Sequence, residues 1–190
     1  MDLDSMLATL QDLSKNHKVI ANEVWQSTQK DSIKNHKIWL DFKNLSAENA
    51  LDALNELERL CEKYDYPRQN FIIESSEFES LKPFKNAKFY TSYYVPYFPL
   101  DELESKRDSI KTHLENVIKS GNVNALSFAY YLYEFMESLG LNIDFPAIDF
   151  LTWNEAQNKA KNLEIDAFQN PQVKVILAGE KPLYRPQPYR

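Results

Sequence analysis

The feature that most constrains the fold is a regular alternation of short apolar segments with longer amphipathic ones, running from residue 37 to residue 180. The short segments are rich in β-branched and aromatic residues, which favour strands. The predicted strands are residues 37–43, 70–76, 87–95, 125–130, 147–153 and 173–179. Strands that alternate with helices form βαβ units and a parallel sheet. We therefore expect an α/β fold with about six βα units.

The helical segments between these strands follow the same logic. Ser46 is placed to cap the first of them, which carries leucines at helical spacing and ends before Pro67. We expect one β/α domain over residues 1–190. It comprises an N-terminal helical segment (1–36), six βα units (37–180) and an extended proline-rich tail (181–190). Periodicity alone leaves open whether the sheet is open or closes into a barrel.

Composition excludes several classes of function. The net charge is −6 and no run is rich in Lys or Arg, which argues against nucleic-acid binding. The three glycines stand singly, so glycine-rich phosphate loops are absent. No apolar run approaches the roughly 18 residues that predict a membrane span. The lone Cys61 excludes an intrachain disulfide and fits a reducing compartment, so we expect a cytoplasmic protein.

Polar residues interrupt the first strand, in the stretch IWLDFKNL (38–45). Side chains alternate along a strand, so Trp39, Asp41 and Lys43 share one face. The apolar set on the other face should pack against the covering helices. We expect Asp41 and Lys43 to face the sheet's interior side at the strand's carboxyl end, where α/β folds place their chemistry. The alternative is a structural ion pair, or side chains that emerge into solvent.

Other strand ends carry further candidates. Glu74 and Ser76 end the second strand, Tyr94 or Tyr93 the third, and Trp153 the fifth. A buried carboxylate is costly without a cation, which asks for a lysine or a metal nearby. The alternative for Glu74 is a cap of the following helix. The aromatic run FYTSYYVPYF could stack on a sugar or line a pocket, and its alternative is packing.

At this point the residues resemble a known group. The succession IWLDFKNL, FIIESSEFESLKPF, YTSYY, IDFLTWN and VKVILAGEKP is similar to the phospholipase-C-like phosphodiesterase superfamily, above all its glycerophosphodiester phosphodiesterases and menorin-like proteins. The resemblance covers residues 1–182. It implies a β/α barrel in which Asp41 and Lys43 replace a Glu-x-Lys-like pair. Thr152 and Asn154 match a Trp-Thr-x-Asn element whose tryptophan is here Leu151.

The resemblance also implies roles for these residues. Asp41 would help to hold a divalent metal, Mg²⁺ or Ca²⁺, and Lys43 would lie near the phosphate. The family's first two strands, with His-Arg-Gly and Glu-x-Asp motifs, and its second histidine have no counterpart here. We therefore expect an incomplete barrel, either truncated or degenerate.

Three functions follow as hypotheses. The first is a phosphodiesterase-like barrel protein, a truncated or inactive phosphoric diester hydrolase. The second is a non-catalytic protein that binds a phosphorylated or sugar-containing ligand. The third is a structural subunit that pairs with another chain through exposed strand edges at 37–43 and 173–179. The candidate site comprises Lys43 and Glu74 as catalytic residues, Asp41 as metal ligand, and Lys43, Ser76, Tyr94 and Trp153 as substrate contacts.

Overall fold

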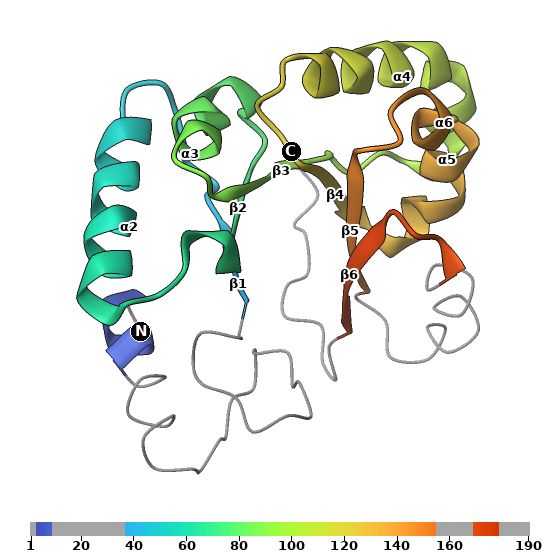
Figure 1. Ribbon diagram of the computed structural model, residues 1–190. Coiled ribbons are helices and arrows are strands. Elements are labelled where there is room, and N and C mark those ends of the chain that lie inside the picture. Colours follow the sequence, from blue (N-terminus) through green and yellow to red (C-terminus); the bar gives the residue numbers. More distant parts are fainter. Residues whose placement is uncertain (1–2, 9–36, 155–168, 179–190) are drawn as a thin grey trace. The chain divides into compact units, whose positions relative to one another are not determined.

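The computed structural model describes residues 3–8, 37–154 and 169–178, and confirms the α/β class. Six strands follow the order β1-β2-β3-β4-β5-β6 in the sheet, as they do along the chain (Figure 1). The pairs β1–β2, β3–β4, β4–β5 and β5–β6 are all parallel. Six strands in the described part of the chain are fewer than the eight of a closed barrel, so the barrel-like fold seen in these residues is incomplete. Pairing of the outer strands with another chain stays a prediction.

The chain divides into two compact units, Met1–Thr91 and Ser92–Arg190. The boundary falls inside strand β3 (Tyr90–Tyr94). The first unit contains β1 (Ile38–Asp41), α2 (Ala50–Tyr64), η2 (Arg68–Asn70), β2 (Phe71–Ser75), η3 (Phe78–Leu81) and α3 (Lys82–Asn86). A short helical segment over residues 3–8 precedes them.

The second unit continues the alternation of strands and helices. Its elements are the end of β3, η4 (Leu100–Glu102), α4 (Leu103–Lys119), β4 (Ala125–Ala129), η5 (Tyr130–Leu132), α5 (Tyr133–Ser138), α6 (Leu141–Asp144), β5 (Asp149–Asn154) and β6 (Val173–Ala178). Every residue of β4 is buried, as expected for a parallel strand covered on both faces. No helix in the described part of the chain has the length and apolarity needed to cross a lipid bilayer.

Aromatic side chains fill the core of each unit. In the first, Phe71 packs against Tyr66 and Phe89, with ring centroids 5.0 and 6.1 Å apart. In the second, the rings of Phe128 and Phe150 meet edge to face at 5.4 Å, and neither is accessible to solvent. Buried aromatic pairs of this kind account for much of a core's stability.

The predicted strands are confirmed with shorter bounds, but the start of the first long helix is not where we predicted it. Asn49, not Ser46, is the N-cap of α2. The Ser46 carbonyl accepts the backbone N–H of Ala50 at 3.0 Å, and its own N–H donates to the Asn49 side chain at 2.8 Å. A tight turn therefore precedes the helix. Ala50, the first residue of α2, is buried, whereas Leu51 is 61% exposed.

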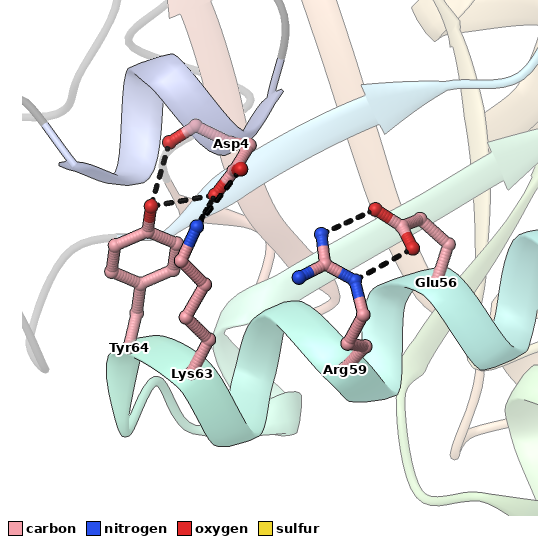
Figure 2. Close-up of polar contacts among 5 residues, drawn as sticks. All are labelled: Asp4, Glu56, Arg59, Lys63 and Tyr64. Atoms are coloured by element: carbon pink, nitrogen blue, oxygen red, sulfur yellow. Dashed lines mark hydrogen bonds and ion pairs between the residues drawn. The ribbon is translucent and has the colours of Figure 1, made fainter.

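Polar contacts tie the segment 3–8 to α2 (Figure 2). The Lys63 ammonium donates to both carboxylate oxygens of Asp4, at 2.7 and 2.9 Å. The Tyr64 hydroxyl donates to the same carboxylate at 2.6 Å. These hydrogen bonds, from Lys63 first and Tyr64 second, lower the pKa of Asp4 below its ordinary value.

This depressed pKa gives a prediction with a definite sign. Protonation of Asp4 removes the acceptor, so its contribution to docking is present at neutral pH and is lost as the pH falls through the lowered pKa. A carboxyl ¹³C NMR titration should place the midpoint of Asp4 below about 3.9, the ordinary value for an aspartate. Lys63→Met should move the Asp4 midpoint upward. An Asp4 midpoint at or above about 3.9 in the unsubstituted protein would contradict this prediction.

Candidate functional site

Two groups of side chains lie at carboxyl ends of strands, one in each unit. The first is the carboxylate–lysine cluster, which we define as Asp41, Lys43 and Glu74. Asp41 and Glu74 are register partners in the parallel pair β1–β2. Register partners in neighbouring strands project from the same face of a sheet. The fold therefore places two carboxylates side by side at the ends of their strands.

The lysine completes this cluster. The Lys43 Nζ lies 2.6 Å from the Asp41 Oδ2. The Asp41 and Lys43 side chains are 36% and 68% exposed, whereas Glu74 is only 3% exposed. An exposed ion pair contributes little to stability, about 0–1 kcal/mol. The pair is thus accessible to a solute, and a buried carboxyl group lies beneath it in the neighbouring strand.

The predicted alternation of faces along β1 is confirmed by the apolar side. Phe42 contacts the ring of Phe84 in α3 at 6.1 Å and also lies beside Leu57 and Leu60 of α2. Because Phe42 faces the helices and its N–H still pairs with β2, Asp41 before it faces the opposite side of the sheet, whereas Lys43 lies in the turn that follows β1. The Phe42 N–H donates to the Glu74 carbonyl at 2.8 Å, which extends the pairing of the strands past Asp41.

Ser76 follows directly after β2 and is exposed. Its neighbour Ser75 is buried, and the Ser75 hydroxyl accepts the Glu77 N–H at 3.1 Å. Ser75 therefore closes the turn after β2, while Ser76 remains open to solvent at the strand end that carries Glu74. Contact between Ser76 and a substrate stays a prediction.

The donor set can be tested against the metal that the resemblance implies. Among the described residues, no three His, Cys, Asp or Glu side chains gather closely enough to hold an ion by themselves. Asp41 and Glu74 offer two carboxylates, short of the six to eight oxygen ligands that Ca²⁺ takes. Mg²⁺ is commonly held by one or two carboxylates together with water and substrate phosphate. The carboxylate–lysine cluster therefore suits Mg²⁺ only if water and a substrate phosphate supply the remaining ligands.

The second group is the aromatic platform, which we define as Tyr94, Tyr97, Tyr131 and Trp153. Tyr94 ends β3, Tyr131 lies in η5 directly after β4, and Trp153 lies near the end of β5. The rings of Tyr94 and Trp153 stack with centroids 5.5 Å apart and planes 14° apart. Tyr97 stands edge-on to both, at 6.2 and 6.5 Å, and stacks on Tyr131 at 6.2 Å.

The structure resolves the choice between the two tyrosines of the third strand. The Tyr93 hydroxyl lies 2.8 Å from the His113 Nε2 in α4, so Tyr93 faces the covering helix. Tyr94 faces the other way and joins Trp153, which brings two predicted site residues together. Their separation of 59 positions in the chain hides this contact from the sequence.

Tyr97 and Tyr131 were not among the predicted site residues. Tyr97 lies in the aromatic run after β3, and the run itself was the available signal. For Tyr131, the sequence contained no signal other than its position after a predicted strand. The Trp153 Nε1–H donates to the Tyr97 hydroxyl at 3.3 Å, which connects the loop to β5.

A hollow of about 490 Å³ in the first unit is separate from the predicted site residues. Its lining includes Leu3, Phe42, Leu57 and Leu60, with Asp4, Glu56 and Arg59 as charged members. Arg59 donates to both carboxylate oxygens of Glu56, at 2.9 and 2.7 Å (Figure 2). This pairing lowers the pKa of Glu56 and raises that of Arg59. Each charged group at this hollow thus has a partner: Glu56 and Arg59 pair with each other, and Asp4 pairs with Lys63.

Comparison with known proteins supports the fold. The chain is similar to the crystal structure of a glycerophosphodiester phosphodiesterase from Parabacteroides distasonis ATCC 8503. The match has a TM-score of 0.52 and 14% identity, and it covers 77% of this chain and 54% of that one. A putative glycerophosphodiester phosphodiesterase from Galdieria sulphuraria matches with a TM-score of 0.45, 18% identity, and coverage of 75% and 53%. No family model and no curated protein matches the sequence.

The first of these likenesses shows that the chain has a fold of the glycerophosphodiester phosphodiesterase type, as the sequence motifs predicted. The chain spans about half the length of each of these two structures. A likeness in fold does not by itself transfer an activity, because function depends on the site.

Proposed function

We propose that the carboxylate–lysine cluster binds the phosphate group of a phosphodiester, in a phosphodiesterase-like barrel protein. The observation that carries this proposal is the register of Asp41 with Glu74, at strand ends of a fold shared with a phosphodiesterase. Lys43 supplies an accessible ammonium for the phosphate oxygens, held at the strand end by its contact with Asp41. The position of Lys43 suits an anionic ligand, and a bound divalent cation would offset the charge of the two carboxylates beside it.

The remaining groups have roles that follow from their chemistry. Asp41 and Glu74 would hold Mg²⁺ when phosphate is also bound, and the ion would neutralise charge on the phosphate oxygens. Glu74 lies in a buried position, where a carboxyl group can exchange a proton with a substrate oxygen. Ser76 would donate a hydrogen bond from the exposed turn after β2. The alternative is that the cluster binds such a ligand without cleaving it.

The test of binding uses sn-glycerol 3-phosphate and dibutyl phosphate as probes, followed by calorimetry and ³¹P NMR. Lys43→Ala is expected to weaken binding of both about tenfold or more, because a hydrogen bond to a charged group contributes about 1.5–3 kcal/mol. Lys82→Ala removes an exposed lysine at the start of α3 and should leave the affinity unchanged. Equal affinity in all three proteins would remove Lys43 from the site.

Substitution of Asp41 can distinguish phosphate binding by Lys43 alone from phosphate binding through a Mg²⁺ ion. Without Mg²⁺, Asp41→Asn releases Lys43 from its carboxylate partner, so anion binding should be retained or strengthened. With Mg²⁺, the same substitution should weaken binding, because one of two carboxylates is lost. A phosphate affinity that changes neither on addition of Mg²⁺ nor in Asp41→Asn would contradict a metal-binding role for Asp41.

A further inference from the structure

The aromatic platform of the second unit has features that packing alone does not require. Tyr97 and Tyr131 are 36% and 43% exposed, whereas Tyr93, Tyr130 and Tyr133 of the same unit are buried. The stacked rings of Tyr97 and Tyr131 are therefore exposed, and the neighbouring rings of Tyr94 and Trp153 are partly buried.

The platform is also held rigidly. The Tyr131 hydroxyl accepts the Phe98 N–H at 3.1 Å and donates to the Phe98 carbonyl at 2.9 Å. Pro96 and Pro99 flank this short loop and restrict its backbone. The Tyr131 side chain therefore holds both backbone polar groups of Phe98, and Phe98 directly follows Tyr97, whose ring stacks on Tyr131. Such preorganisation lowers the cost of ordering a site when a ligand binds.

We propose that the aromatic platform binds a neutral sugar ring, independently of the phosphate site proposed above. One face of a pyranose carries C–H groups with a slight positive charge, which suits the negative face of an aromatic ring. The Trp153 Nε1–H and the Tyr131 hydroxyl are already engaged in hydrogen bonds within the protein, so the contribution expected from the platform is stacking of its rings on the sugar face.

The ring geometry favours a sugar over a cation or a nucleotide. A quaternary ammonium ion needs an open space with several ring faces around it. Here the parallel rings lie only 5.5 and 6.2 Å apart, so no such space remains between them. A ligand can instead reach the exposed parts of the Tyr97 and Tyr131 rings. The net charge of −6 disfavours nucleotides, which would otherwise stack equally well on these rings.

Saturation-transfer difference NMR can test this proposal on the full chain. The probes are lactose, maltotetraose and cellotetraose, with tetramethylammonium chloride as a fourth ligand. At least one sugar should receive saturation, mainly at the C–H protons of one ring face. Tyr97→Ala should weaken its affinity about tenfold, as expected for loss of a stacked ring. Tyr131→Phe keeps the ring but loses the two contacts to Phe98, and should weaken binding less.

A matched control is Ile143→Ala, which removes an apolar side chain that is 79% exposed on α6. It should bind the sugar as the unsubstituted chain does, and circular dichroism should show all variants folded. No saturation transfer to any sugar at about 20 mM, far above a millimolar dissociation constant, would overturn the proposal. Tyr97-dependent binding of tetramethylammonium alone would likewise overturn it.

Discussion

Replacing Phe128 with alanine is expected to lower the free energy of unfolding by about 3–5 kcal/mol, the usual cost of removing a fully buried phenylalanine. Phe128 lies in the middle of β4, a strand buried along its whole length, and none of its surface is accessible. Its ring meets that of Phe150 in β5 at 5.4 Å and 76°. Truncation leaves a cavity between two strands and removes a favourable edge-to-face contact.

The size of this effect follows from the marginal stability of folded domains. A domain of this size is stable by about 5–15 kcal/mol, so the loss is a large fraction of the total. Urea unfolding followed by circular dichroism measures it. Ile143→Ala, at an exposed site in the same unit, should change the stability by less than about 0.5 kcal/mol. A loss below about 1 kcal/mol in Phe128→Ala would mean that β4 is not buried as described.

The second large effect is expected at Glu74. If the cluster cleaves a phosphodiester, Glu74→Gln should reduce the Mg²⁺-dependent hydrolysis of bis(4-nitrophenyl) phosphate by about 10²- to 10⁴-fold. Glutamine keeps the shape of the buried side chain but cannot exchange a proton as a carboxyl group does. A spectrophotometric assay of 4-nitrophenolate release gives the rate.

The controls distinguish a chemical role of Glu74 from a structural one. Asp52→Asn removes an exposed carboxylate of α2 and should leave the rate unchanged. Glu74→Asp, which keeps the carboxyl group, should recover part of the activity. Hydrolysis unaffected by Glu74→Gln would exclude Glu74 as an acid or base. Phosphate binding without any turnover in the unsubstituted chain would assign the cluster a binding role and remove the catalytic roles of Lys43 and Glu74.

Much of the fold could be predicted because the relevant signals are local. Alternating β-rich and helical segments gave six strands in the correct order, and the period of two along IWLDFK gave the two faces of β1. The predicted outward side of Phe42 agrees with its contact to Phe84. The start of α2 was misplaced because Ser46 and Asn49 are both good caps, and only the turn before the helix selects Asn49.

The sequence identified some of the candidate site residues because their positions at strand ends are also local signals. Asp41, Lys43 and Glu74 could be assigned to strand ends, but their proximity depends on the register of β1 with β2. A shift by one residue would have moved Glu74 to the helix face. Likewise, no local pattern links Tyr131 to Tyr97, because their stacking depends on how β3 and β4 align.

Local patterns in the sequence were enough to set the class of fold, the succession of strands and the residues of the first strand that share a face, because these depend on the periodicity and propensity of neighbouring residues. Packing in three dimensions was needed to set the face of Tyr94 and to establish which residues of different strands become neighbours: Asp41 with Glu74, and Tyr94 with Trp153. Register is set by the packing of whole helices and strands against one another, and such long-range packing leaves no mark within any single segment.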